Sequence, residues 1–142
     1  MERLTIKELA PYLPYGVLGM DKRGVIYELG VEPTFAMQPQ VRDCYSFIAY
    51  NIKPLLRPLS SLTEEIEHNG ERFVPKDKIH NYTKVDENGT LYVLVDGTQW
   101  QSNPLRWGYE TVNWLISLHF DVFGLIDRGL ALPIDGKEVE GE

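Results

Sequence analysis

The chain has 142 residues, of which 43% are hydrophobic and 25% charged, and this balance is typical of a globular protein with one hydrophobic core. It predicts a single domain over residues 1–134, followed by an acidic tail over residues 135–142 that we expect to fray. The formal net charge of −7 opposes non-specific binding to nucleic acid or to an anionic membrane.

The basic residues are scattered, and a few convergent arginines could still form a local pocket for a small anion against the overall charge. The scattered basic residues include Arg23, Arg42, Arg57, Arg72 and Arg128. The single cysteine excludes an internal disulfide, and no apolar run has the length of a signal or of a membrane span. We therefore expect a cytoplasmic location.

Two elements are predicted in the first thirty residues. Thr5 and Glu8 have the spacing of a capping box, which predicts a short helix that Pro11 and Pro14 limit. Over residues 17–29 apolar residues alternate around a polar Asp-Lys-Arg-Gly turn, and this pattern predicts a hairpin.

The next segment contains fewer clear signals. Residues 30–43 contain proline and glycine without periodicity and are expected to form a loop. Residues 44–52 are rich in strand formers and are expected to form a strand, whereas residues 55–57, between two prolines, predict an extended connector. Ser61 and Glu64 have the spacing of a second capping box, which predicts a short helix from Leu62.

The second half of the chain has the strongest patterns. The Asn69-Gly70 pair either ends a helix or forms a tight turn between residues 66–68 and 72–74. Residues 82–95 predict a hairpin around Asn88-Gly89. A long helix is expected from Pro104, with Asn103 as its cap, and residues 122–128 predict its continuation or a second short helix that ends at Gly129 in the left-handed cap position.

Candidates for metal binding and catalysis are few. His119 and Asp121, with Asp127 or a distant histidine, could ligate a metal, but a histidine that bonds a backbone group and an aspartate that caps a helix are the simpler interpretation. The distant histidines are His68 and His80, both expected in loops. We expect no metal site.

Nucleophile candidates have ordinary structural explanations as well. Cys44, in its predicted strand, is expected to be a buried, inert thiol, and Ser60 and Ser61 are explained by helix capping. The sequence has no glycine-rich hydrolase elbow and no phosphate-binding loop. We therefore expect a protein that is not an enzyme and that has no cofactor.

Binding candidates gather near the predicted long helix. Trp100, Arg106 and Tyr109 flank its start, where free backbone amides favour anions and an aromatic ring can stack on a base. Trp107 and Trp114 are seven residues apart and are expected to lie in the core instead.

Three blocks in the chain carry a resemblance. They are LAPYLPYG at residues 9–16, RPLSSLTEEI at 57–66 leading through Asn-Gly to FVP at 73–75, and HFDVFGLI at 119–126 followed by GLA at 129–131. In these blocks the chain resembles a group of uncharacterised small proteins from phages and integrated mobile elements of gut anaerobic bacteria. The resemblance implies an accessory protein in a host cell, without implying an activity.

Together these observations predict an α+β fold, an antiparallel sheet of about four to six strands with one long C-terminal helix packed on a face. The expected function is non-enzymatic: an anti-defence phage or mobile-element protein that binds and inhibits a host protein. The alternative is a small-molecule sponge that sequesters a nucleotide immune signal. A homo-oligomer is compatible with either function.

Overall fold

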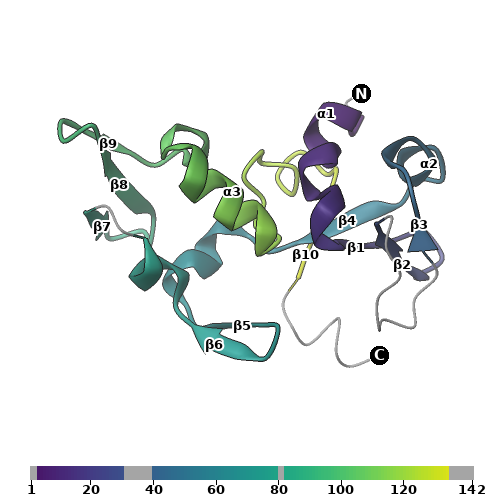
Figure 1. Ribbon diagram of the computed structural model, residues 1–142, viewed down its shortest axis with the longest axis horizontal. Helices are drawn as coiled ribbons and strands as arrows, with labels where there is room; N and C mark the ends of the chain where they lie inside the picture. The colour runs from purple at the N-terminus through teal and green to yellow at the C-terminus, as the bar shows by residue number, and fades with distance from the viewer. Residues whose placement is uncertain (1–2, 31–39, 80–81, 135–142) are drawn as a thin grey trace. The chain divides into compact units, whose positions relative to one another are not determined.

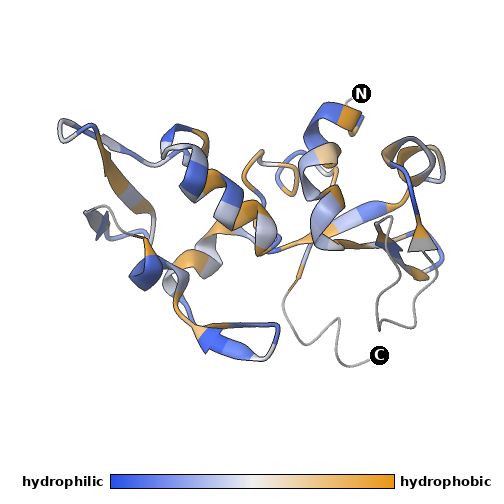
Figure 2. Ribbon diagram, in the orientation of Figure 1, coloured by the Kyte–Doolittle hydropathy of each residue, from blue (hydrophilic) through white to orange (hydrophobic). Residues whose placement is uncertain are grey.

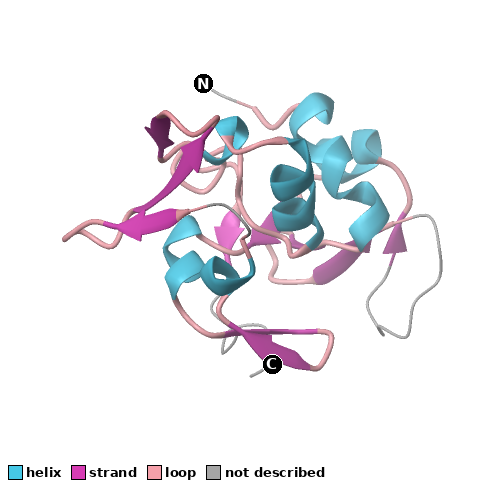
Figure 3. Ribbon diagram, turned by 60° about the vertical axis from the view of Figure 1, so that its left-hand side comes forward, coloured by secondary structure: helices cyan, strands magenta, loops and turns pink. Residues whose placement is uncertain are grey.

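The computed structural model describes residues 3–30, 40–79 and 82–134. The chain divides into two compact units, which we call unit 1 (residues 1–57 with 123–142) and unit 2 (residues 58–122). Short helices and strands alternate with loops in both (Figures 1 and 3), so the predicted α+β class is confirmed. The single domain over residues 1–134 stays a prediction, and the tail over residues 135–142 lies outside the described residues.

Unit 1 is built on a five-stranded mixed sheet with the strand order β10-β4-β1-β2-β3. Its strands are β1 (Leu18–Met20), β2 (Ile26–Leu29), β3 (Gln40–Val41), β4 (Lys53–Leu56) and β10 (Leu132–Pro133). β1 pairs antiparallel with both β2 and β4, but β3 and β10 pair parallel at the two ends of this order. The prediction of one antiparallel sheet is therefore wrong, because both outer strands return to the sheet through long connections instead of tight turns.

The predicted hairpin over residues 17–29 is confirmed as β1 and β2, with Leu18 opposite Glu28 and Met20 opposite Ile26. Asp21 organises its turn. One carboxylate oxygen, Oδ1, accepts hydrogen bonds from the backbone amides of Arg23 at 2.9 Å and Val25 at 3.0 Å. These side-chain bonds add to the backbone pairing of the turn, in which the Gly24 amide donates to the Asp21 carbonyl at 3.0 Å.

Strand β4 is found where the sequence predicted an extended connector over residues 55–57. Leu55 and Leu56 are buried and pair with β10, whereas Pro54 lies opposite Gly19 of β1. Proline has no amide to donate, and it is tolerated here because the β10 pairing begins one residue later. Gln40 and Val41, at the end of the predicted loop 30–43, form β3; residues 31–39 lie outside the described residues.

The strand predicted over residues 44–52 is wrong, because these residues form helix α2 (Cys44–Ala49). Asp43 is its N-cap: its Oδ1 accepts a hydrogen bond from the Ser46 amide at 2.7 Å. The cap and the burial of Cys44 and Phe47 on one helix face outweigh the strand propensity of the aromatic residues.

Helix α1 (Ile6–Leu9) confirms the first capping box: Thr5 accepts from the Glu8 amide and the Glu8 side chain accepts from the Thr5 amide. The 3₁₀ helix η1 (Ala10–Tyr15) continues it and contains Pro14. It ends at Gly16, whose φ of 65° lies in the left-handed region.

The core of unit 1 joins the two short helices to the sheet. Its most buried side chains are Leu9, Tyr12, Val17, Leu29, Phe47, Ile52, Leu55, Leu56 and Leu125. Gly19 of β1 lies against this core so closely that a Cβ atom there would be 2.3 Å from Cζ of Phe47 and 2.6 Å from Cγ2 of Ile52. The sheet and α2 pack together only because residue 19 has no side chain.

Unit 2 begins with the 3₁₀ helix η2 (Leu59–Thr63), followed by strands β5 (Ile66–His68) and β6 (Glu71–Phe73) and the 3₁₀ helix η3 (Pro75–Lys78). The Asn69-Gly70 ambiguity is resolved in favour of the tight turn, with φ of 53° and 84° at the two residues. The helix predicted from Leu62 is wrong: η2 ends at Thr63 and has no side-chain cap, so Ser61 and Glu64 do not form a capping box.

A three-stranded antiparallel sheet follows, formed by β7 (Thr83–Val85), β8 (Leu91–Val95) and β9 (Gln99–Gln101). It confirms the hairpin over residues 82–95, although only Gly89 of the Asn88-Gly89 pair has a positive φ. β9 had no prediction. It is linked to β8 by a turn at Asp96 and Gly97, with φ of 57° and 71°.

The prediction of one long C-terminal helix is wrong. Asn103 does act as a cap, but the helix it starts is the three-residue 3₁₀ helix η4 (Pro104–Arg106). Gly108, with a φ of 103°, interrupts the segment, and helix α3 (Tyr109–Ser117) has nine residues. Figure 2 shows hydrophilic and hydrophobic residues alternating around α3, whose buried residues are Leu115 and Ile116.

The short helix predicted over residues 122–128 is also wrong, since these residues form turns. Gly129 nevertheless has the predicted left-handed conformation, with a φ of 76°, and the Leu130 amide donates to the Leu125 carbonyl at 2.9 Å. None of the helices in the described ranges has the length and apolar character that crossing a bilayer requires.

Candidate binding site

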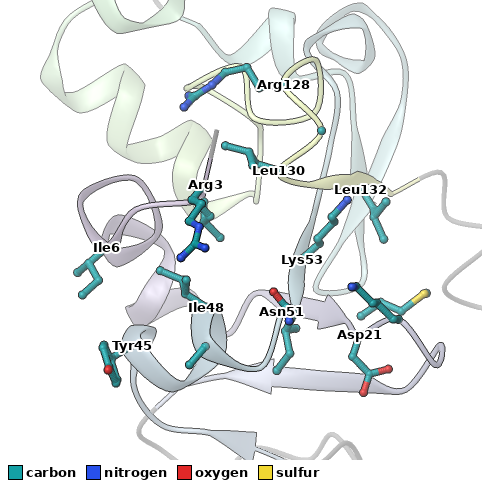
Figure 4. Close-up of a pocket in the computed structure, with 16 residues that line it drawn as sticks. Arg3, Ile6, Asp21, Tyr45, Ile48, Asn51, Lys53, Arg128, Leu130 and Leu132 are labelled. Atoms are coloured by element: carbon teal, nitrogen blue, oxygen red, sulfur yellow. The ribbon is translucent and has the colours of Figure 1, made fainter. Parts of the chain in front are cut away.

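Unit 1 contains an open cavity of about 1160 Å³ (Figure 4). Its walls come from the residues before α1, the β1–β2 turn, α2 with the residues after it, the start of β4 and the segment before β10. Small-molecule sites typically have volumes of about 300–1,000 Å³, so the volume of this cavity lies just above that range. It is open to solvent on a face where several side chains are strongly exposed.

The charge of the cavity is opposite to that of the chain. Arg3, Lys22, Lys53 and Arg128 contribute four cationic side chains to the lining, and Asp21 contributes its one carboxylate. The whole chain has a net charge of −7. The cavity is therefore a locally positive region, as the sequence allowed for a few convergent basic residues.

Asp21 does little to offset these cations, because its carboxylate is engaged in the hairpin turn. Oδ2 accepts from the Arg23 guanidinium at 2.9 Å and from the Tyr27 hydroxyl at 3.0 Å. Burial raises the pKa of Asp21, but the hydrogen bonds from Arg23, Val25 and Tyr27 outweigh it and lower the pKa to about 2. Figure 4 shows the carboxylate turned away from Arg3 and Lys53.

The four cations differ in how far they are already paired. Arg128 donates to Glu8 Oε2 at 2.6 Å, and this bond counters the effect of burial and lowers the pKa of Glu8. Arg3, Lys22 and Lys53 make no ion pair or side-chain hydrogen bond within the described ranges, and all three are exposed. As far as the described residues show, three cations are thus available to an external anion.

Apolar side chains form the rest of the lining. They are Leu4, Ile6, Met20, Tyr45, Ile48, Ala49, Ile52, Leu130 and Leu132. Tyr45 and Ile6 have exposed fractions of 73% and 50%, which is high for large hydrophobic residues. The opposite face of α2, with Cys44 and Phe47, is buried, so the helix presents Tyr45 and Ile48 to the cavity because of its amphipathic pattern.

A second, smaller cavity of about 630 Å³ is also lined by residues of the β1–β2 turn. It shares Asp21, Lys22 and Asn51 with the larger cavity and adds Tyr27 and Tyr50, among others. Tyr50 has an exposed fraction of 67%. The turn therefore has exposed aromatic and cationic groups near both cavities.

The three predicted binding residues lie in unit 2 and come from three different elements. Trp100 is in β9, Arg106 in η4, and Tyr109 is the first residue of α3, with an exposed fraction of 79%. The Lys84 ammonium lies 4.4 Å from the centre of the Trp100 ring, a cation–π contact. Their role in binding stays a prediction.

The two tryptophans expected in the core differ. Trp107 is buried, and its indole N–H donates to the Gln101 carbonyl at 2.7 Å. Trp114 is half-buried and packs against Phe73, with ring centres 6.3 Å apart. They do not share a helix face, because Gly108 separates them.

The metal candidates are only partly brought together. His119, which has a positive φ of 67°, packs edge-on against His68 of β5 with ring centres 5.4 Å apart. Asp121 is buried and Asp127 exposed, and His80 lies outside the described residues. Within the described ranges, no three histidine, cysteine, aspartate or glutamate side chains form a group that could hold a metal ion.

The candidate nucleophiles are one cysteine in a helix and two serines in a 3₁₀ helix. Cys44 is buried in α2, not in a strand, and burial raises the pKa of its thiol. Ser60 and Ser61 lie in η2, where no side chain caps the helix, so the capping explanation for them is wrong.

Sequence reasoning missed the cations that are available in the cavity. Arg3, Lys22 and Lys53 are far apart along the chain and belong to no motif, so only the sheet brings them together. The available signal was indirect: basic residues scattered through an acidic chain. Comparison with protein-family models, with curated proteins and with solved structures finds no match for the chain.

Proposed function

We propose that this protein is a non-enzymatic binding protein that engages another protein through the cavity of unit 1. One observation carries the proposal: the cavity combines exposed apolar side chains with three cations that make no ion pair in the described part of the chain. An exposed apolar region with a polar rim is the arrangement that protein interfaces use. The cavity is open, and its strongly exposed apolar side chains suit contact with part of a protein surface.

The partner in this proposal is a host protein of a bacterial cell, and binding inhibits it. The resemblance to phage and mobile-element proteins supports this part of the proposal. An accessory protein of that kind acts by occupying a surface of its target, for which it needs a complementary interface and no catalytic group. Oligomerisation would be compatible with such a role.

The test begins with affinity capture of the tagged full chain from a lysate of the host bacterium. The captured protein is then purified and mixed with the chain, and the complex is measured by calorimetry and by size-exclusion chromatography. We expect a stoichiometric complex and a loss of the partner's own activity. A partner that does not rebind after purification, or that keeps its full activity in the complex, contradicts the proposal.

The second candidate function is the sequestration of a nucleotide signal, and the contact between Lys84 and Trp100 favours it. A cation next to an exposed aromatic ring offers a nucleotide both a phosphate partner and a stacking surface. Native mass spectrometry of the protein purified from its host separates the two functions. A bound small anion that is lost in Trp100→Ala supports the sponge, whereas a bound protein supports the leading proposal.

A further inference from the structure

We infer that the cavity of unit 1 binds an acidic peptide segment of the partner, in which apolar side chains lie next to carboxylates. This inference rests on the proposed function and specifies the chemistry of the partner. Its basis is charge complementarity between Arg3, Lys22 and Lys53 and the carboxylates of such a segment.

The first argument is that these cations make no ion pair with any residue that the structure describes. Elsewhere in the described ranges, Arg23 pairs with Asp21, Arg72 with Glu65 and Glu67, and Lys78 with Glu71. Lys7, Arg42 and Arg106 make no ion pair there either, so an unpaired cation alone does not point to a ligand. Arg3, Lys22 and Lys53 differ from those three in lining one cavity together, and a ligand that brings carboxylates would pair with them.

The second argument is that the ligand must also have apolar groups. Tyr45, Ile48, Leu130 and Leu132 line the same cavity as the cations, and Figure 4 shows Arg3 between Ile48 and Leu130. A free inorganic anion would leave these side chains in water. A peptide with leucine or phenylalanine beside its acidic residues covers them and pairs with the cations at the same time.

The third argument distinguishes a peptide from a nucleic acid. The phosphates of a bound nucleic acid would continue beyond the cavity. There the net charge of −7 of the chain would repel them. A peptide needs negative charge only where it meets Arg3, Lys22 and Lys53. The lining also has one aromatic side chain, Tyr45, whereas binding of single strands relies on several stacked rings.

The experiment uses the full chain and a random peptide library displayed on yeast. Selection is run in parallel against the wild type and against the double variant Arg3→Glu/Lys53→Glu. The matched control is Lys7→Glu/Arg42→Glu, which makes the same change in charge at two exposed residues of unit 1 that line neither cavity. We expect the wild type and the control to enrich peptides with acidic and apolar residues, and the cavity variant not to enrich them.

The best enriched peptide is then labelled, and its affinity is measured by fluorescence anisotropy. We expect the cavity variant to bind it at least about tenfold more weakly, the control to match the wild type, and the wild-type affinity to fall as salt rises. Tyr45→Ser, at an exposed position, should weaken binding about threefold or more by removing apolar contact. Circular dichroism verifies that every variant is folded.

Several outcomes overturn the inference. The selection overturns it if no peptide is enriched or if the enriched peptides have no excess of acidic residues. The affinity measurement overturns it if the two double variants bind the peptide equally well. Stronger binding of a single-stranded oligonucleotide or of pyrophosphate than of the peptide, at the same cations, overturns it as well. If the inference fails while a host protein still forms a stoichiometric complex, the proposed function stands and its interface lies elsewhere. If peptides bind as expected but no host protein forms a complex, the cavity specificity stands and the host-protein function fails.

Discussion

The packing of α2 on the sheet of unit 1 depends on Gly19, and Gly19→Ala tests it directly. A Cβ atom at this position would lie 2.3 Å from Cζ of Phe47, 2.6 Å from Cγ2 of Ile52 and 3.0 Å from the Lys53 carbonyl oxygen. Phe47 is fully buried, and β1 is paired on both sides, so neither the ring nor the strand can move away without further loss. Overpacking of this kind typically costs about 1–3 kcal/mol, and the short distances place Gly19→Ala near the upper value, about 3 kcal/mol.

For a chain of this size, such a loss lowers Tm by about 10 °C. The measurement is urea and thermal unfolding followed by circular dichroism. Gly24→Ala is the comparator, because its Cβ meets nothing within 4 Å and only its positive φ of 86° opposes the change. That variant should lose about 1–2 kcal/mol from backbone strain alone.

A double-mutant cycle with Phe47→Leu identifies the cause. Leucine lacks the Cζ atom of the ring, so Gly19→Ala should be less destabilising in the Phe47→Leu background, with a coupling of about 1–2 kcal/mol. Gly19→Ala that melts like the wild type, or a coupling near zero, would refute the close packing of β1 against α2. It would also remove the support for Tyr45 and Ile48 as a wall of the cavity, because Phe47 anchors their helix.

Three further measurements test individual contacts. Trp114→Ala removes a half-buried ring that packs on Phe73 and should cost about 2–3 kcal/mol in chemical denaturation, less than a fully buried tryptophan; unchanged stability would mean that the contact contributes nothing. The folded-state pKa of Asp21 is lowered from 3.8 to about 2, so the carboxylate stabilises the fold fully above about pH 4 and loses this effect as the pH falls towards 2. The difference in unfolding free energy between wild type and Asp21→Asn should therefore close over that range. A constant difference contradicts the role of the Arg23 and Tyr27 hydrogen bonds. The buried Cys44 thiol, with its raised pKa, should react with a thiol reagent in minutes only after denaturation, and rapid reaction of the native chain would show that α2 opens easily.

Local interactions were readable from the sequence. The capping box of Thr5 and Glu8, the hairpin around Asp21 and the left-handed Gly129 each depend on residues within a few positions of one another. Such signals keep their meaning in most tertiary contexts because the competing conformations lack the same hydrogen bonds. They established the α+β class.

Where two local signals competed, the sequence did not decide between them. Residues 44–52 have strand propensity, yet the Asp43 cap and the burial of Phe47 form a helix. Asn103 and Pro104 predicted the start of a long helix, but the positive φ at Gly108 separates η4 from α3. The indole N–H of Trp107 donates to the Gln101 carbonyl. In both cases a specific contact or backbone angle outweighs a propensity of a few tenths of a kcal/mol per residue.

The cavity is a property of the tertiary structure alone. The sequence by itself determined that the chain is acidic, that its basic residues are scattered and that no catalytic motif groups them. The mixed sheet of unit 1 then brings the parallel strand β10 next to β4 and so places Lys53 near the segment from Arg128 to Leu132, with Arg3 and α2 completing the wall. Parallel pairing joins residues separated by long stretches of chain, and no local pattern encodes which distant strand is chosen, so the convergence of these cations could not be read before the fold was known.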